Sequence, residues 1–239
     1  MKVIPIKGTI ISNNSKWIYE LFEREATAPK DIVLPETGED VEIHINSGGG
    51  DVYAGSEIYT ALRAYSGRVT VKIVGIAASA ASVIAMAGDS VEISPTAQIM
   101  IHNVSSGVYG DHNALEHEAA VLKGFNKSIA SAYVHKTGKA LSDLLELMNQ
   151  TTWFDAEAAV ENGFADKVMF AQEVAPLLVA SETPMIPEDF IERMQATMTP
   201  DVDKIAELVA QKLAEHEPEK EKTEKKKAPE PSGFGRFAF

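Results

Sequence analysis

Two residues that follow apolar runs could together perform nucleophilic catalysis. Ser79 comes after "VTVKIVGIAA" and opens a stretch of small residues that predicts a helix, and His102 comes directly after "QIMI". A serine hydroxyl becomes a nucleophile when a base stands beside it, and histidine is the usual base. The pair therefore predicts acyl transfer if the fold unites the two side chains. Otherwise, Ser79 would only cap its helix or bond to its own turn, and His102 would be a structural histidine.

A run of glycines lies between a predicted strand and a predicted helix, in "INSGGGDVYAG" at residues 45–55. Glycine permits positive φ and exposes backbone N–H groups beside a helix N-terminus, which is an anion-binding surface. Such a surface could hold a phosphate or the oxyanion of a tetrahedral intermediate. The run has neither the GxxxxGK[ST] nor the GxGxxG spacing of nucleotide-binding loops. A tight turn without a ligand is the remaining alternative.

The elements that must position these residues alternate between strands and helices. This alternation predicts an α/β fold with parallel strand pairing, in which sites form at the ends of strands. We expect strands at 2–11, 41–46, 68–75, 90–95 and 98–103, and helices at 14–25, 52–65, 79–88, 112–137, 142–150 and 156–164.

The longest predicted helix, 112–137, combines a start signal with an apolar stripe. Asn113 and Glu116 fit a capping box, and Gly138 is a natural stop. The residues expected on its buried face are Leu115, Ala119, Leu122, Phe125, Ile129 and Tyr133.

Composition excludes several classes of function. The net charge of −13 over 239 residues argues against nucleic acid and anionic membranes as partners. The sequence has no cysteine and no HxxxH pair, so we expect no disulfide, no metal site and no cofactor. Neither a signal peptide nor an apolar run that could span a bilayer is apparent, which predicts a cytoplasmic protein.

Composition also changes along the chain and predicts four regions. Residues 1–170 form the expected catalytic domain, and 171–200 form a linker broken by prolines. Residues 201–216 predict an amphipathic helix, and 217–239 predict a disordered charged tail. The tail ends in "FGRFAF", a candidate peptide for docking to a partner.

Four motifs together, "INSGGGDVYAG", "GIAASAAS", "MIHN" and "FDAEAAVENGFAD", resemble the Clp protease proteolytic subunit family (ClpP-like). They are most similar to its phage branch, the prohead or head maturation proteases. The resemblance covers about residues 1–170 and implies the ClpP/crotonase-like spiral of ββα units. It also implies an oligomeric ring built through a long dimerisation-type helix, here 112–137. The implied activity is serine endopeptidase cleavage of capsid or scaffold proteins.

The resemblance assigns roles residue by residue. It implies Ser79 as the nucleophile and His102 as the general base. The backbone N–H groups of Gly50 and Ala80 would form the oxyanion hole, with Gly49 shaping the turn.

The chain departs from the family pattern in three respects. Gly48 stands where the family has proline, and Thr151 stands at the position of the family's third catalytic residue, an acid. Asp155, Asp111 or water could take the place of that acid, or the enzyme could act as a slower pair. The chain also enters its first strand almost at once, whereas subunits that work with an ATP-driven unfoldase begin with a longer segment. We therefore expect ATP-independent action.

Two other functions compete with the protease hypothesis. A crotonase-type enzyme would use the glycine turn to hold the enolate of an acyl-CoA and would need no serine nucleophile. A catalytically impaired assembly module would explain Thr151.

Overall fold

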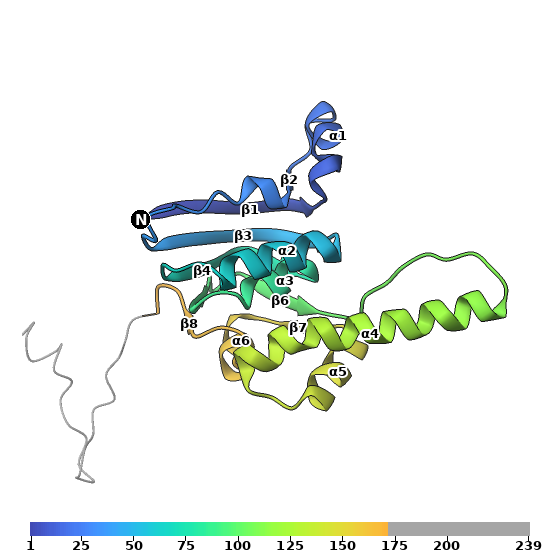
Figure 1. Cartoon of the computed structure of the whole chain (residues 1–239). Helices are drawn as coiled ribbons and strands as arrows, with labels where there is room; N and C mark the ends of the chain where they lie inside the picture. The colour runs from blue at the N-terminus through green and yellow to red at the C-terminus, as the bar shows by residue number, and fades with distance from the viewer. Residues whose placement is uncertain (172–239) are drawn as a thin grey trace, which may run out of the picture. The chain divides into compact units, whose positions relative to one another are not determined.

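The computed structural model describes residues 1–171, which contain a sheet of 8 strands (Figure 1). Residues from 172 onward lie outside the described part of the chain. These residues include nearly all of the linker predicted for 171–200, the helix predicted for 201–216 and the tail predicted for 217–239. The strands are β1 (Lys2–Ile10), β2 (Ala26–Thr27), β3 (Val41–Gly50), β4 (Val69–Ala78), β5 (Ser90–Ile93), β6 (Gln98–Ile101), β7 (Thr152–Phe154) and β8 (Lys167–Val168).

The sheet is parallel except at one pair of strands. Its main path runs β2-β1-β3-β4-β5-β8, and β6 branches from the end of β4. Strand β7 pairs with β6 in the antiparallel sense. The predicted α/β fold with parallel pairing is therefore confirmed.

Helices connect the strands. They are α1 (Lys16–Leu21), α2 (Val52–Arg63), α3 (Ala80–Ala85), α4 (His112–Thr137), α5 (Leu141–Asn149) and α6 (Ala156–Glu161), with 3-10 turns η1 (Asn13–Ser15) and η2 (Pro29–Asp31).

The core forms where helices α2 and α3 cover β3 and β4 (Figure 1). Isoleucine and valine dominate these strands because β-branched side chains pack well on a pleated surface. Helix α2 turns Ile58 and Leu62 toward the core, and all six residues of α3 are buried. The small residues of α3 suit this position, because they let the helix approach the sheet closely.

Helix α4 has the predicted bounds, but its N-cap lies two residues before Asn113, the N-cap of the predicted capping box. Its N-cap is Asp111, whose carboxylate accepts the Ala114 N–H at 3.0 Å, and it ends at Gly138 with φ 69° as predicted. The predicted apolar stripe is wrong for the first half of the helix, which extends away from the sheet (Figure 1). Buried positions begin only at Ile129.

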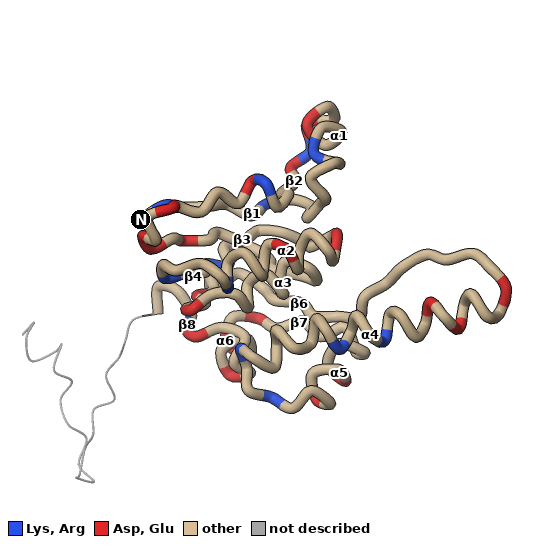
Figure 2. The backbone as a smooth tube through the Cα atoms, in the orientation of Figure 1, with Lys and Arg blue, Asp and Glu red and all other residues tan. Residues whose placement is uncertain are grey.

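Charged residues are numerous where β3 and β4 begin and around α1 (Figure 2). Within residues 1–171, no helix has the length and apolar character required to cross a lipid bilayer.

Candidate active site

Ser79 occupies the turn at which strand β4 passes into helix α3. Its backbone has φ 55° and ψ −125°, a conformation that residues other than glycine rarely adopt. The Ser79 N–H donates to the carbonyl oxygen of Met100 at 2.9 Å, which ties the turn to strand β6. The side chain makes no capping hydrogen bond to α3, so the hydroxyl is available to another partner.

That partner is His102, which follows strand β6. The distance between His102 Nε2 and Ser79 Oγ is 2.8 Å, although 23 positions separate the two residues in the chain. Parallel pairing sets Ala78 beside Met100, so the residues that follow emerge at the same edge of the sheet. A neutral imidazole with its proton on Nδ1 can accept the serine proton at Nε2, which is the contact that activates a serine.

The glycine run reaches the same edge from strand β3. Gly49 has φ 92°, and a Cβ added there would lie 2.6 Å from the Ala78 carbonyl oxygen and 2.9 Å from the Ala80 nitrogen. Only glycine can bring the backbone this close to the Ser79 turn. Gly48 differs, because an added Cβ would meet no atom within 4 Å.

Two residues with candidate N–H donors lie beside Ser79. Ala80 is the first residue of α3, so its N–H has no partner within the helix. Gly50 has φ 148° and lines the same cavity as Ser79. The N–H of the following residue, Asp51, donates to Ile10 of β1 at 2.9 Å.

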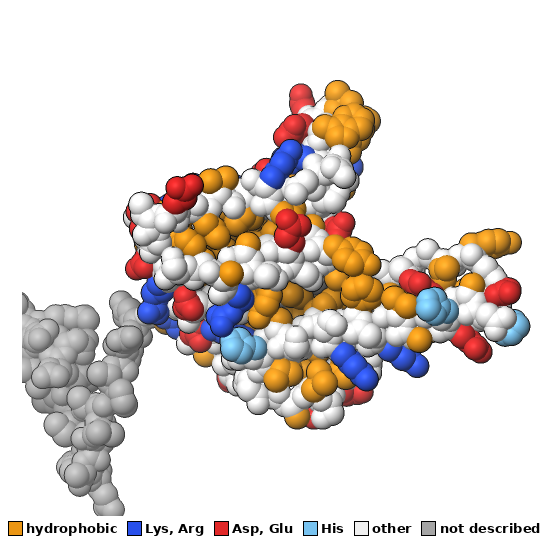
Figure 3. All heavy atoms as spheres, viewed as in Figure 1, with side chains coloured by type: hydrophobic (Ala, Val, Ile, Leu, Met, Phe, Trp, Pro, Cys, Tyr) orange, Lys and Arg blue, Asp and Glu red, His pale blue; other side chains and the backbone are white. Residues whose placement is uncertain are grey.

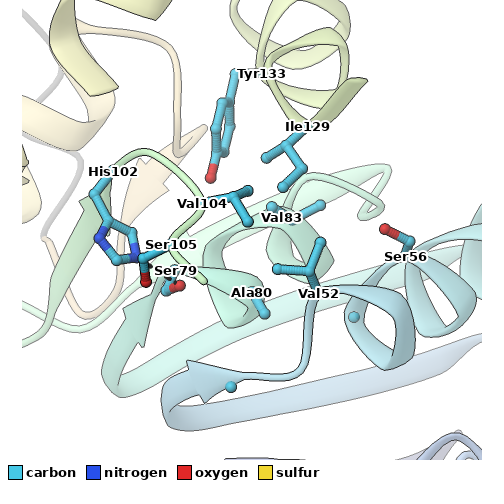
Figure 4. A pocket seen from close by; sticks show the side chains of 12 residues that line it. Val52, Ser56, Ser79, Ala80, Val83, His102, Val104, Ser105, Ile129 and Tyr133 are labelled. Carbon is cyan, nitrogen blue, oxygen red and sulfur yellow. Dashed lines mark hydrogen bonds between the residues drawn. The ribbon is translucent and has the colours of Figure 1, made fainter. Parts of the chain in front are cut away.

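A cavity of about 150 Å³ brings these groups together, since Gly50, Ser79, Ala80 and His102 all line it. Figure 4 shows the His102 ring beside Ser79 at one end of this space and Tyr133 reaching into it from α4. The remaining walls are mostly apolar and include Val52, Val83, Val104 and Ile129.

A second hollow of about 390 Å³ adjoins this cavity and shares Gly50 and Val104 with it. Its apolar wall includes Tyr53 and Phe125, whose rings meet edge to face at 5.5 Å. Figure 3 shows apolar side chains gathered between α2 and α4, where this hollow opens. The two spaces are therefore neighbours, and the first of them contains Ser79.

In a catalytic triad, the second ring nitrogen of the histidine donates a hydrogen bond to an acid, and in His102 this nitrogen is Nδ1. The antiparallel register of β6 and β7 ends at the pair of Ile101 and Thr152, and His102 and Thr151 are the next residues outward from this last pair. Thr151 is exposed and has φ 54°, which is unusual for a β-branched residue. Within residues 1–171, no aspartate or glutamate forms a hydrogen bond or ion pair with His102.

The two acids considered as substitutes have other contacts. Asp155 caps α6 by accepting the Ala158 N–H at 2.9 Å, and Asp111 caps α4. Neither carboxylate is bonded to His102.

The structure adds a contact that the sequence did not indicate. Ser82 and Tyr133 lie 51 positions apart, and their hydroxyl oxygens are 2.8 Å apart in the core. Tyr133 was expected only as part of an apolar stripe. The serine inside the small-residue run was a weak signal, because a buried hydroxyl requires a partner.

No group of three or more histidine, aspartate or glutamate residues within positions 1–171 is arranged to hold a metal ion.

Comparison with known proteins gives a family for this architecture. The sequence model described as Clp protease matches residues 31–172. The match includes the glycine run, Ser79, His102 and Thr151, and it leaves out residues 1–30.

Individual relatives are bacterial. The chain is 29% identical over 132 residues to "ATP-dependent Clp protease proteolytic subunit 2" of Tropheryma whipplei, covering 54% of this chain and 73% of that protein. It is 32% identical over 136 residues to the "ATP-dependent Clp protease proteolytic subunit" of Bacteroides fragilis, covering 56% and 66%. For "ATP-dependent Clp protease proteolytic subunit 1" of Salinibacter ruber the values are 29% over 131 residues, 54% and 56%. The alignments thus span less than two thirds of the Bacteroides and Salinibacter proteins.

Proposed function

This chain belongs to the Clp protease family, and from that premise we propose that it is a serine endopeptidase that works through an acyl-enzyme. The observation that carries the proposal is the distance of 2.8 Å between Ser79 Oγ and His102 Nε2. The cavity around this pair adjoins the second, mostly apolar hollow, which gives room for substrate residues beside the scissile bond.

The first half of the reaction forms the acyl-enzyme. Ser79 Oγ attacks the carbonyl carbon of the scissile peptide bond while His102 Nε2 takes the hydroxyl proton. Negative charge develops on the carbonyl oxygen, and the N–H groups of Gly50 and Ala80 donate hydrogen bonds to it. The C–N bond then breaks, and the leaving amine takes the proton from His102.

The second half regenerates the enzyme. Water gives a proton to His102 and attacks the ester carbonyl. The tetrahedral intermediate then collapses as the C–Oγ bond breaks and His102 returns the proton to Ser79 Oγ, which leaves a carboxylic acid and the free enzyme. Within residues 1–171, no carboxylate is bonded to His102, and Thr151 stands at the position where the family pattern has an acid. We therefore expect slower turnover than a complete triad gives, since no carboxylate of these residues orients the ring or stabilises the imidazolium.

A narrower proposal than endopeptidase activity concerns the class of substrate. We propose that the enzyme processes phage capsid or scaffold proteins without ATP, on the basis of the four motifs that resemble head maturation proteases. The curated relatives carry the words "ATP-dependent" in their names, so the two alternatives make different predictions. Purified chain that cleaves scaffold protein without an unfoldase or ATP would support this role, and cleavage only when both are supplied would contradict it.

We also propose a homo-oligomer assembled through α4. The first half of this helix contributes no buried residue, and Leu115 and the preceding Tyr109 are 49% and 103% exposed. Sedimentation velocity tests the assembly, and a monomer at all concentrations would contradict it.

The test of the catalytic proposal is labelling with a fluorophosphonate, followed by mass spectrometry of the modified peptide. We expect an adduct on Ser79 that is absent in Ser79→Ala and strongly reduced in His102→Ala. Thermal melting of each variant checks that the fold is retained. A folded wild-type protein without any adduct would overturn the proposal.

The alternative function is a catalytically impaired assembly module, and Thr151 is the observation that favours it. This alternative predicts an assembled protein that neither reacts with the fluorophosphonate nor cleaves unfolded casein.

A further inference from the structure

A chain of hydrogen bonds connects helix α4 to the backbone of the candidate nucleophile. The Ser82 hydroxyl donates to the carbonyl oxygen of Ser79 at 2.7 Å. The hydroxyl of Tyr133, which lies on α4, is 2.8 Å from Ser82 Oγ. Tyr133 of α4, Ser82 of α3 and the strained turn at Ser79 are therefore joined by consecutive hydrogen bonds.

The direction of each bond follows from the number of protons. A serine hydroxyl has one proton, and that of Ser82 is directed to the Ser79 carbonyl. The Tyr133 hydroxyl must therefore donate to Ser82 Oγ. Burial raises the pKa of the Tyr133 hydroxyl well above its ordinary value, so it remains a donor throughout the usual pH range.

Both side chains are enclosed by the core. Ser82 is 0% exposed and Tyr133 is 1% exposed. The Tyr133 ring packs against Phe164 at a centroid distance of 5.8 Å, which fixes the hydroxyl in place. A buried hydroxyl pair of this kind is rigid because each member would be costly to leave without a partner.

The site requires such rigidity at this point. Ser79 has φ 55° in an unfavourable region, and its carbonyl oxygen also accepts the N–H groups of Ser82 at 3.0 Å and Val83 at 3.3 Å. A strained conformation persists only where the surroundings over-determine it. The Ser82 hydroxyl adds a further bond to this carbonyl, and Tyr133 fixes the direction of that bond.

We propose that Ser82 and Tyr133 are positioning residues that hold the Ser79 turn in its reactive geometry and make that geometry depend on the seating of α4. This inference rests on the proposed serine protease function. Neither residue is assigned contact with the reacting atoms. Displacement of α4 would loosen Tyr133 first, then Ser82 and then the turn.

The test measures the reactivity of Ser79 separately from peptide binding. Tyr133→Phe keeps the ring and removes the donor, while Ser82→Ala removes the bond to the Ser79 carbonyl. We expect the rate constant for fluorophosphonate labelling to fall about fivefold in Tyr133→Phe, as for one lost hydrogen bond. In Ser82→Ala we expect a fall of about tenfold or more, because small misplacements of a nucleophile are costly. With labelled casein, kcat should fall while KM stays unchanged.

The double variant separates positioning from simple stability. Ser82→Ala leaves the Tyr133 hydroxyl buried without a partner, whereas Ser82→Ala with Tyr133→Phe leaves no orphan group. The double variant should therefore melt at a higher temperature than Ser82→Ala but label as slowly. If Ser82→Ala does not fold, Tyr133→Phe alone decides the outcome.

A matched control is Tyr65→Phe, which removes a tyrosine hydroxyl bonded to the Glu39 carbonyl oxygen outside the residues that line the cavity. It should label at the wild-type rate. Wild-type labelling rates in both Tyr133→Phe and folded Ser82→Ala would overturn this inference alone. Absence of labelling in the wild-type protein would overturn the proposed function and this inference with it.

Discussion

Strands β3 and β4 are regular over their first halves and irregular near their ends. Residues 41–45 pair with residues 69–73 without a break, and the register shifts between Ile45 and Ser47. Beyond the shift lie Gly49 with φ 92° and Ser79 with φ 55°. The same two strands therefore contain an orderly region and a strained one.

The orderly region is stabilised by packing and by charge. Its inward residues, among them Ile43 and Val71, are 0% exposed. On one face, Glu42 forms an ion pair with Lys72 and a hydrogen bond with His44. Charged residues are correspondingly frequent at this end of the sheet (Figure 2).

The strained region contains the candidate catalytic groups. There Gly49 approaches the Ser79 turn closely, and Ser79 itself has an unfavourable positive φ. The regular halves of these strands therefore contribute packing and charge pairing, whereas their irregular ends contribute the candidate catalytic groups. Substitutions in the two halves should therefore have different signatures.

The largest effect is expected from removing the nucleophile. Ser79→Gly and Ser79→Ala should each lower kcat by roughly 10⁴-fold or more in peptide cleavage assays. Glycine also relieves the positive φ, so Ser79→Gly should be more stable than Ser79→Ala by about 1 kcal/mol in urea unfolding. Equal stability of the two variants would show that the turn is not strained.

The next effect tests the close approach of the glycine turn. Gly49→Ala should lower the free energy of unfolding by about 2–4 kcal/mol, because its Cβ would meet the Ala78 and Ala80 backbone and φ is positive. The control Gly48→Ala should change it by less than about 0.5 kcal/mol. Urea unfolding measures both, and similar losses would contradict the distinction between these neighbours.

A smaller effect is expected from restoring a carboxylate at position 151, where the family pattern has an acid. Thr151→Asp should raise kcat/KM about tenfold, only part of what a triad acid supplies, because position 151 is exposed. Thr151→Asn is the matched control, since asparagine tolerates the left-handed backbone equally well without charge. An equal gain in both variants would assign the effect to strain instead of charge.

The smallest effect belongs to the orderly region. The hydrogen bond from Lys72, with a second from His44, holds the pKa of Glu42 below its ordinary value. Because the pKa of Glu42 is lower in the folded state than in the unfolded state, its contacts stabilise the fold above the ordinary pKa of glutamate. This stabilisation is lost as the pH falls through the folded-state pKa.

Glu42→Gln should therefore lower the free energy of unfolding by about 0.5–1 kcal/mol at pH 7, with a difference that shrinks below about pH 4. Catalytic constants should not change. Urea unfolding as a function of pH checks the first expectation, and a difference that persists at low pH would contradict the ion-pair explanation.

The sequence was informative wherever local pattern decides structure. Alternating strand and helix signals predicted the α/β fold, and Gly138 marked the end of α4 correctly. The apolar stripe predicted for α4 was wrong over its first half, because periodicity shows which face is apolar but not what covers it. Of the six residues in the predicted stripe, only Ile129 and Tyr133 are buried. Which part of the helix is covered depends on where the sheet ends.

The residue types available for chemistry can be read from the sequence: a serine and a histidine after apolar runs, flexible glycines, and a threonine in place of an acid. Their distances come from the folded chain. Strand pairing brings Ser79 to His102, and helix packing joins Ser82 to Tyr133. Contacts between residues 23 or 51 positions apart depend on the register and packing of whole elements, and no local pattern specifies these.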